Sequence, residues 1–271
     1  IQNIMPMLLN EINNNDEIKE KLFQINFRSN QLNKLMITVI YHKKIDASLI
    51  ALLNQISKNL NINIIARSKN FVHGIRGLYL EDMLAYKNLK IFQTDNTFTQ
   101  SNKYLVDKMI SNVINFIDNQ RDLLELYCGI GTFTLPLSFK FNKILATESN
   151  RKSIKCLEKS LQENKISNVH NARLSSNEVS ELFDGRIFNR MNMKNINDYD
   201  FSHILLDPPR SGLTEDVISF ASNFENIIYV SCNSETYVRD IKLLESHEID
   251  KIELFDQFPN KNHLELSLIH I

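Results

Sequence analysis

The sequence of 271 residues has few of the features that split a chain into loosely linked parts or place it in a membrane. It holds six glycines and five prolines, with no Gly/Ser-rich or proline-rich linker and no internal repeat. No window approaches the roughly 18 apolar residues that a membrane-spanning helix needs. The first residues, Ile-Gln-Asn-Ile, lack the basic region of a signal peptide. These absences argue against a membrane-spanning or secreted protein.

Cysteine is scarce as well. The three cysteines, Cys128, Cys156 and Cys232, are far apart and odd in number. This pattern argues against a disulfide framework or a zinc site and indicates a reducing compartment. We therefore expect a cytoplasmic protein without a metal site.

The sequence also lacks an excess of basic residues, since its formal net charge is −1. Residues 1–120 hold 14 Lys and Arg against 10 Asp and Glu, whereas residues 121–271 hold 17 against 22. Phosphate contacts require a basic face and not a basic average. A chance asymmetry of a solvated surface would look the same, so charge neither supports nor excludes a nucleic-acid partner.

Residues 1–100 alternate short elements and predict an α+β domain. The expected elements are an amphipathic start at residues 4–12, β-rich runs at 22–27 and 35–41, a helical stretch at 49–53, a strand at 62–66 and a hairpin-like Gly74–Gly77. A helix at residues 103–119 then leads into a second domain, which we place at residues 101–271.

From residue 122 onward, apolar strands alternate with amphipathic helical segments, which predicts βαβ crossovers and a mostly parallel sheet. The predicted strands cover residues 123–127, 143–147, 169–173, 204–206 and 227–230. Two further strands, 251–255 and 264–270, have no long helix between them and are expected to form an antiparallel pair at the end of the sheet. The predicted fold class is therefore α/β, a Rossmann-like sheet with a smaller α+β N-terminal domain. Sheets of this kind bind ligands at the carboxyl ends of their strands.

The first of these strands runs into a glycine-rich turn at residues 128–133. Gly129 and Gly131 permit a tight turn and a close approach of the backbone to a ligand. The turn lacks the third glycine of a dinucleotide site and the lysine of a phosphate loop. The next strand ends at Glu148, which is placed either to accept hydrogen bonds from two ribose hydroxyls or to cap a helix. Together the turn and Glu148 favour a nucleoside cofactor without pyrophosphate, and S-adenosylmethionine fits best.

Candidate catalytic side chains follow the later strands. Asp207 ends a strand, and the two prolines after it fix the backbone ahead of Arg210. Burial as a small apolar residue is the default for Cys128 and Cys156. Cys232 differs, because it leaves a strand ahead of a helix, where the helix N-terminus and a nearby arginine would favour its thiolate.

His263 and Glu265 are two residues apart at the start of the last predicted strand, where an extended backbone would put them on one face. Such a pair is compatible with a surface pair or with metal ligands that lack a third partner. Beside Cys232, an acid–base role gains weight.

Five ordered motifs resemble those of the RNA uracil-5 methyltransferases. They are Leu-Tyr-Cys-Gly-x-Gly-x-Phe (126–133), Ala-Thr-Glu (146–148), Asp-Pro-Pro-Arg-Ser-Gly-Leu (207–213), Ser-Cys-Asn (231–233) and Phe-Asp-Gln-Phe-Pro…His-x-Glu (255–265). The likeness is closest to the bacterial tRNA branch, and it extends to residues 21–25, 41–44 and 96–102. It therefore covers nearly the whole chain.

The resemblance implies a class I methyltransferase sheet and the transfer of a methyl group from S-adenosylmethionine to C5 of uridine 54 in the T-loop of tRNA. It implies that Cys232 is the nucleophile that attacks C6 and that Glu265 is the proton acceptor. Asp207 would face the uracil edge or the cofactor, and Arg210 would stabilise the enolate oxygen. The positions matching cofactor contacts are Gln100, Tyr127, Gly129, Gly131, Thr132, Glu148 and Asp207.

The target base must leave its stack for this chemistry, and the resemblance matches Phe23 to a position where an aromatic ring stacks on the opened RNA loop. A core phenylalanine on a strand is the alternative. The implied partner is RNA, bound by a monomer. The ribosomal-RNA branch often carries an iron–sulfur cluster, but three scattered cysteines argue against one here.

Some positions depart from the tRNA pattern. Ile130 and Thr132 stand where asparagine is usual, Ser234 replaces a proline, and Lys261-Asn262 stand where Thr-His is usual. Because Gly-Ile-Gly-Thr-Phe also occurs in the ribosomal-RNA branch, a 23S rRNA substrate is one alternative. The family also implies a segment ahead of Ile1, so a truncated RNA-binding or RNA-folding homologue without turnover is another.

Overall fold

The structure, a computed structural model, describes residues 1–100, 102, 104–191, 195–256 and 265–270, the last range by its backbone alone. The chain divides into two compact units, residues 1–83 with 92–96 and residues 84–91 with 97–271. The division falls within the two-stranded sheet of β5 (Leu80–Leu84) and β6 (Leu89–Gln93). The predicted domain boundary at residue 100 stays a prediction.

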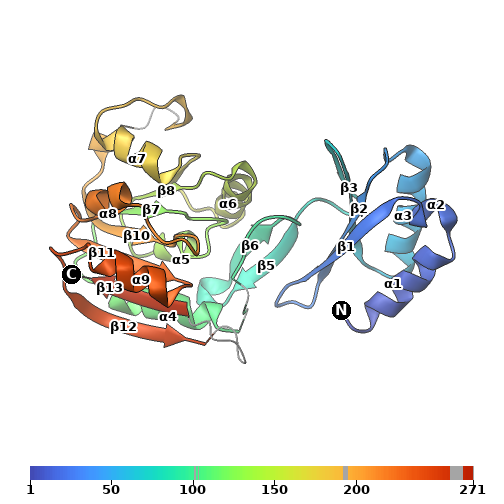
Figure 1. The fold of residues 1–271 in the computed structure, drawn as a ribbon, viewed down its shortest axis with the longest axis horizontal. Helices are drawn as coiled ribbons and strands as arrows, with labels where there is room; N and C mark the ends of the chain where they lie inside the picture. Colours follow the sequence, from blue (N-terminus) through green and yellow to red (C-terminus); the bar gives the residue numbers. More distant parts are fainter. Residues whose placement is uncertain (101, 103, 192–194, 257–264, 271) are drawn as a thin grey trace. The chain divides into compact units, whose positions relative to one another are not determined.

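The first unit contains a four-stranded sheet of order β1-β2-β3-β4 with helices against it (Figure 1). Its elements are α1 (Ile4–Asn13), α2 (Asp16–Lys19), β1 (Leu22–Ser29), β2 (Leu35–Tyr41), α3 (Ala47–Asn59), β3 (Asn63–Ser68) and β4 (Phe71–Gly74). Ile37 and Val39 lie two apart on β2 and so face the same side. Both pack in one core with Leu8 of α1, Leu53 of α3 and Ile64 of β3. The expected α+β arrangement is present in this unit.

One hairpin turn of this unit was not predicted. β3 and β4 are antiparallel and Ser68 pairs with Phe71, so the hairpin turn is formed by Lys69 and Asn70. Asn70 has a φ of 60°, a left-handed conformation that asparagine tolerates better than most residues. The turn expected at Gly74–Gly77 is also present, since the Gly77 N–H donates to the Gly74 carbonyl oxygen at 3.3 Å, but it follows β4 and does not join β3 to β4.

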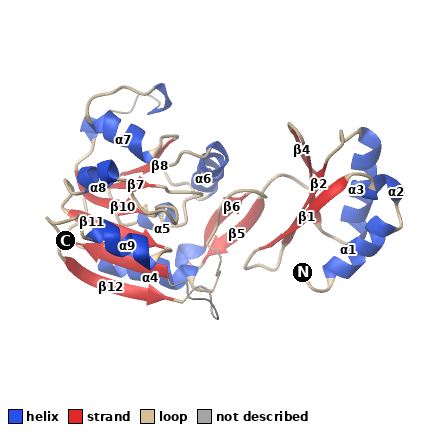
Figure 2. Ribbon diagram, viewed as in Figure 1, coloured by secondary structure: helices blue, strands red, loops and turns tan. Residues whose placement is uncertain are grey.

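The second unit contains a seven-stranded sheet of order β12-β13-β11-β10-β7-β8-β9 (Figure 2). Its strands are β7 (Asp122–Leu126), β8 (Ile144–Thr147), β9 (Val169–Ala172), β10 (Phe201–Leu206), β11 (Asn226–Ser231), β12 (Ile249–Phe255) and β13 (Glu265–His270). From β11 to β9 all neighbours are parallel, whereas β13 is antiparallel to both β11 and β12. The α/β class, the mostly parallel sheet and the antiparallel C-terminal pair are thereby confirmed.

The helices of this unit follow its strands, apart from α4, which precedes β7. They are α4 (Val106–Phe116), α5 (Thr134–Leu137), α6 (Arg151–Glu163), α7 (Ser176–Phe183), α8 (Glu215–Ala221) and α9 (Ser234–Ile241), with single 3-10 turns at Tyr86–Asn88, Asn189–Met191 and Ile196–Asp198. α4 is shorter than the helix predicted over residues 103–119, because Ile117 is extended and Asn119 has a φ of 51°.

One hydrophobic cluster packs around the carboxyl-terminal halves of β7 and β10. Leu124 of β7 and Leu206 of β10 are fully buried in it with Val179 of α7, Val217 of α8 and Tyr237 of α9. Full burial of such a side chain contributes about 1.5–3 kcal/mol. The carboxyl ends of β7 and β10 therefore emerge from a rigid core.

Candidate active site

Four parallel strands end side by side at one edge of the large sheet. In sheet order, β8, β7, β10 and β11 run into Glu148, Tyr127, Asp207 and Cys232. Residues predicted from separate motifs thus reach the same edge. In open α/β sheets this is the edge that binds ligands.

The turn after β7 has an unusual backbone. Tyr127 has a φ of 60° and Gly131 a φ of 94°, values that strain most side chains. A Cβ on Gly131 would lie 2.5 Å from Cδ1 of Leu157, so the turn packs directly onto α6. A Cβ on Gly129 would meet nothing within 4 Å. The turn is therefore packed on one side and open on the other, as a backbone that lies along a ligand must be.

Glu148 faces this turn from the end of β8. Its Oε2 accepts a hydrogen bond from the Gly129 N–H at 3.2 Å, and its Oε1 accepts one from the Asn150 N–H at 2.7 Å. The N-cap of α6 is Asn150, whose Oδ1 accepts from the Lys152 and Ser153 amides. The alternative reading of Glu148 as the N-cap was wrong. A half-buried carboxylate beside an open turn fits the ribose of an adenosine cofactor, so these residues fit S-adenosylmethionine.

A buried acid next to this edge escaped the sequence analysis. Glu125 on β7 is 1% exposed, and its Oε2 has no hydrogen-bond partner within the described part of the chain. Burial raises the pKa of Glu125 to about 8, and the Asp207 carboxylate acts in the same direction. Glu125 is therefore mostly protonated at neutral pH. Its signal in the sequence is a single acid within the apolar residues 123–126 of β7.

The three cysteines differ in environment. Cys128 and Cys156 are 6% and 0% exposed, so the burial expected for them is confirmed, whereas Cys232 is half-buried. Burial raises the pKa of the Cys128 thiol well above its usual value, which keeps that side chain protonated and unreactive. Cys232 is the most exposed of the three.

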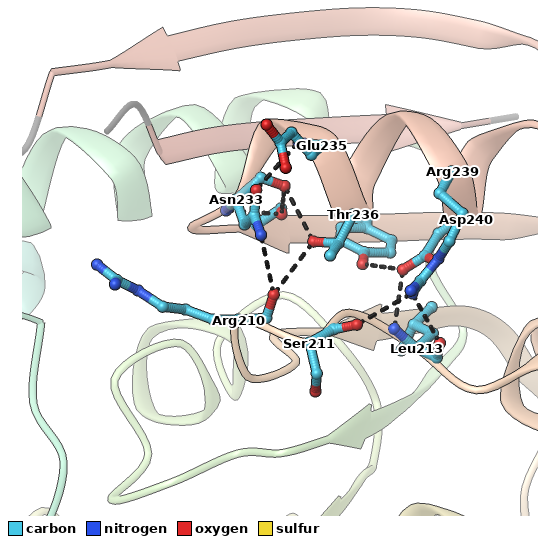
Figure 3. A network of polar contacts seen from close by, with 10 residues as sticks. Arg210, Ser211, Leu213, Asn233, Glu235, Thr236, Arg239 and Asp240 are labelled. Carbon is cyan, nitrogen blue, oxygen red and sulfur yellow. Dashed lines mark hydrogen bonds and ion pairs between the residues drawn. The ribbon is translucent and has the colours of Figure 1, made fainter. Parts of the chain in front are cut away.

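The loop after β10 is hydrogen-bonded to the start of α9. The backbone carbonyl of Arg210 accepts from the side-chain amide of Asn233 at 3.1 Å and from the Thr236 hydroxyl at 3.4 Å (Figure 3). Figure 3 also shows that the Arg210 side chain extends away from α9. At the Cys232 turn itself, the Ser231 hydroxyl accepts from the Asn233 N–H at 3.2 Å. Asn233 thus joins the Arg210 loop to the cysteine turn, a link that the sequence analysis missed.

Glu265 is the first residue of β13. Its backbone pairs with Phe255 of β12, and the next residue, Leu266, pairs with Ser231 of β11. The ladder between β11 and β13 ends at this pair, so Cys232 and Glu265 are the next residue of each segment beyond it. The Glu265 side chain and all of His263 lie outside the described residues.

Gln100 and Thr132 are half-buried, the first in the segment ahead of α4 and the second in the turn after β7. Their roles, like those of the other predicted contacts, stay predictions.

Phe23 lies on β1 in the first unit, and its side chain is 62% exposed. Its ring stacks on His42 with 4.2 Å between ring centroids and 16° between ring planes. The alternative reading of Phe23 as a core residue was wrong. His42 lies in one of the resembling segments, but sequence reasoning gave it no role.

Among the described residues, no group of three or more His, Cys, Asp or Glu side chains is arranged to hold a metal ion. Within the same residues, no helix has the length and the apolar character needed to cross a bilayer.

Known proteins match this chain in sequence and in fold. The family model for tRNA (Uracil-5-)-methyltransferase matches residues 1–270. A tRNA/tmRNA (uracil-C(5))-methyltransferase of Aliarcobacter butzleri is 42% identical over 99% of this chain and 73% of its own length, and one of Campylobacter lari is 43% identical over 98% and 77%. The solved structure of the Pyrococcus abyssi tRNA (uracil-54, C5)-methyltransferase in complex with S-adenosyl-L-homocysteine aligns with a TM-score of 0.75 at 20% identity. That alignment covers 97% of this chain and 65% of that one.

The chain has the fold of a solved methyltransferase structure, and the family model and the relatives show that the protein is an S-adenosylmethionine-dependent methyltransferase. The chain belongs to the tRNA (uracil-5-)-methyltransferase family. The family and the enzyme class indicated by the sequence motifs are confirmed, and the relatives do not favour the ribosomal-RNA alternative.

Proposed function

We propose that the protein transfers a methyl group from S-adenosylmethionine to C5 of uridine 54 in the T-loop of tRNA, through a covalent bond between Cys232 and C6 of the uracil. By their names, the curated relatives act on uracil C5 of tRNA and tmRNA, and the Pyrococcus abyssi enzyme acts on uracil 54. The observation that carries the proposal is the register between β11 and β13.

Ser231 precedes Cys232 and pairs with Leu266, the residue after Glu265. Continued by one residue, this ladder sets Cys232 opposite Glu265. Residues directly opposed on antiparallel strands have Cβ atoms about 4.5–5.5 Å apart. C5 and C6 of uracil are bonded to each other, so a group that attacks C6 and a group that takes the C5 proton must be close neighbours. The register supports this pair of roles.

The two residues have complementary tasks. C5 of uracil is too weak a nucleophile to accept a methyl group directly. When the Cys232 thiolate adds to C6, a C6–S bond forms and the resulting enolate has carbanion character at C5. S-adenosylmethionine, when bound, supplies an electrophilic methyl group. Glu265 then accepts the C5 proton, the C6–S bond breaks, and the thiolate is restored.

The remaining residues of the edge assist these steps. Arg210 places a cation near the enolate oxygen as negative charge develops there. Asp207 contacts the uracil or the cofactor. Glu148 holds the ribose hydroxyls of the cofactor, and its contact with the Gly129 amide keeps the carboxylate at the turn. The further proposed cofactor contacts are Gln100, Tyr127, Gly131 and Thr132.

Recognition of RNA is assigned to the first unit. The exposed Phe23 ring, held by its stack on His42, offers a flat surface for an unstacked base. A groove of about 670 Å³ includes His42 in its wall, and its other lining residues are Tyr41, Lys43, Lys44, Ile45, Ser68, Lys69 and Phe71. Aromatic faces beside lysines match the way single-stranded RNA is bound, by stacking and by phosphate contacts.

The test is methylation of an unmodified tRNA transcript with labelled S-adenosylmethionine, followed by mass spectrometry of the nucleosides. The proposal expects one 5-methyluridine per tRNA. It also expects none in a transcript that has cytidine at position 54, and none in a 23S rRNA fragment. A methyl group on the altered transcript would exclude position 54, and methylation of rRNA alone would favour the other substrate class.

A further inference from the structure

One polar network joins the loop after β10 to α9 (Figure 3). Four side chains at the start and along the body of α9 bind backbone atoms of that loop, and we call them the α9 clamp: Asn233, Thr236, Arg239 and Asp240. The loop atoms that they bind belong to residues 210–213. Arg210 has a role predicted from the sequence, whereas no member of the clamp has one.

Asp240 is the buried centre of the network, with 0% exposure. Its Oδ2 accepts from the Leu213 N–H at 2.8 Å and from the Tyr229 hydroxyl at 2.7 Å, and its Oδ1 accepts from Nε of Arg239 at 2.8 Å. Burial raises the pKa of Tyr229, so its hydroxyl stays a donor. A buried carboxylate is tolerated only with such a full set of donors, so Asp240 fixes Leu213 firmly.

Arg239 adds further hydrogen bonds to the same loop. Its Nη2 donates to the carbonyl oxygens of Ser211 and Leu213, each at 3.0 Å. Gly212 lies between them with a φ of 74°, and a Cβ there would be 2.6 Å from both Arg239 Nη2 and Asp240 Oδ2. The loop and α9 therefore touch so closely that no side chain fits between them.

Asn233 and Thr236 hold the near end of the loop, at Arg210. Asn233 has two tasks, because its Oδ1 caps α9 by accepting from the Glu235 N–H at 3.0 Å while its Nδ2 donates to the Arg210 carbonyl. The cap alone would require only an acceptor. The amide donor is the additional feature, and it connects the residue next to Cys232 with the backbone of Arg210.

We propose that the α9 clamp positions Arg210 relative to Cys232, so that the guanidinium meets the same uracil that the thiolate attacks. The inference rests on the proposed function, and it makes the four clamp residues positioning residues that do not touch the substrate. This role explains why all four side chains form hydrogen bonds with backbone atoms of the same loop. A misplacement of about 1 Å in such a loop costs about 100-fold in rate.

The test uses the pair of substitutions least harmful to folding, Asn233→Ser with Thr236→Val. Serine keeps an acceptor for the helix cap, but it has no amide to reach the Arg210 carbonyl, and valine has the shape of threonine without its hydroxyl. Val238→Ala on the same helix is the matched control, since Val238 is 49% exposed and outside the clamp.

The double variant is expected to lower kcat about 10-fold to 100-fold. KM for tRNA, the Kd of S-adenosylmethionine measured by calorimetry, and the melting temperature should stay close to those of the Val238→Ala control. Asn233→Ser alone should lower kcat more than Thr236→Val alone, because the Asn233 bond to the Arg210 carbonyl is the shorter of the two, 3.1 Å against 3.4 Å.

Unchanged kcat in the double variant overturns the inference. So does a loss of kcat that comes with a matching loss of thermal stability and of cofactor affinity, because that pattern belongs to general destabilisation. Failure of the proposed function looks different: the unsubstituted protein and Val238→Ala would then both form no 5-methyluridine.

Discussion

Ser231 and Leu266 form the final residue pair of the antiparallel ladder between β11 and β13. Cys232 follows the first of them and Glu265 precedes the second. β13 lies between β12 and β11 in the sheet, so it is β13 that pairs with the strand leading to the proposed nucleophile. The antiparallel strand is thus the part of the topology on which the proposed pairing of nucleophile and base depends.

Glu265→Gln tests both the assignment of the base and the order of the steps. We expect Cys232 to attack and the methyl group to transfer, since neither step needs Glu265. Glutamine cannot accept the C5 proton, so elimination stalls and the protein stays covalently joined to methylated RNA. A denaturing gel should show a protein–RNA band that requires both S-adenosylmethionine and Cys232.

The gel also separates the competing outcomes. Normal turnover by Glu265→Gln would make another group the base, with His263 as a candidate. A variant that is inactive but forms no adduct would place Glu265 at an earlier step, such as orientation of the uracil.

The cysteines provide a matched pair of substitutions. Cys232→Ala should abolish turnover and leave the affinity for S-adenosylmethionine within a few fold, because the thiolate attacks the base and not the cofactor. Cys128→Ala should stay active and lose about 1 kcal/mol of stability, since it only removes a buried sulfur atom. Single-turnover methylation, calorimetry and urea unfolding measure the three quantities. Near-normal methylation by Cys232→Ala would exclude the covalent mechanism.

The strand ends could be predicted from the sequence, and the contacts between them could not. Glu148, Asp207 and Cys232 each follow an apolar run, and parallel strands bring such ends to a common edge. The bond from Asn233 to Arg210 depends on how α9 packs against a loop far away in the sequence, and no local pattern contains that information. The stack of His42 on Phe23 likewise requires the register of β1 with β2.

Turn chemistry limited the prediction as well. The hairpin at Lys69–Asn70 uses an asparagine in the left-handed region, and this asparagine is one of many in the chain, so it does not stand out. Glu125 was overlooked for a different reason. The sequence shows an acid within an apolar strand, but it does not show that the Glu125 side chain is buried.

Glu148→Ala should weaken cofactor binding by about 1.5–3 kcal/mol, the cost of losing hydrogen bonds to a charged group. Glu148 also holds the Gly129 and Asn150 amides, so Glu148→Gln serves as the comparison, since it keeps one acceptor oxygen for them. Calorimetry with S-adenosylmethionine measures both variants. Unchanged affinity in Glu148→Ala would remove this residue from the cofactor site.

Phe23→Ala should raise KM for tRNA and leave the affinity for S-adenosylmethionine unchanged. Stacking of a base on an aromatic ring contributes about 1–3 kcal/mol, which corresponds to a change of about 5-fold to 150-fold. Phe23→Tyr keeps the ring and should retain most of the binding. If Phe23→Ala binds tRNA normally, the exposed stack on β1 has another purpose.

Glu125→Gln should change how stability depends on pH. The pKa of Glu125 is about 8 in the folded protein against an ordinary value of 4.5, so the folded state binds the extra proton between these values. Its contribution to stability is therefore complete below about pH 4.5 and is lost as the pH rises through about 8. Glutamine resembles the protonated acid and has no proton to lose. Between pH 6.5 and 8.5 the unsubstituted protein should lose more free energy of unfolding than Glu125→Gln does.

This pH range isolates Glu125 from the buried His203. Burial lowers the pKa of His203 from 6.5 to about 4, so the stability that His203 contributes is complete above pH 6.5 and is lost only as the pH falls below it. Glu163→Gln is the control, because it removes an acid from the surface of α6, where Glu163 forms an ion pair with Lys159. Urea unfolding at pH 6.5, 7.5 and 8.5 measures how the free energy of unfolding changes with pH in the unsubstituted protein, in Glu125→Gln and in Glu163→Gln. If Glu125→Gln and Glu163→Gln lose stability in parallel, Glu125 is ionised throughout the range, and its burial does not hold the proton.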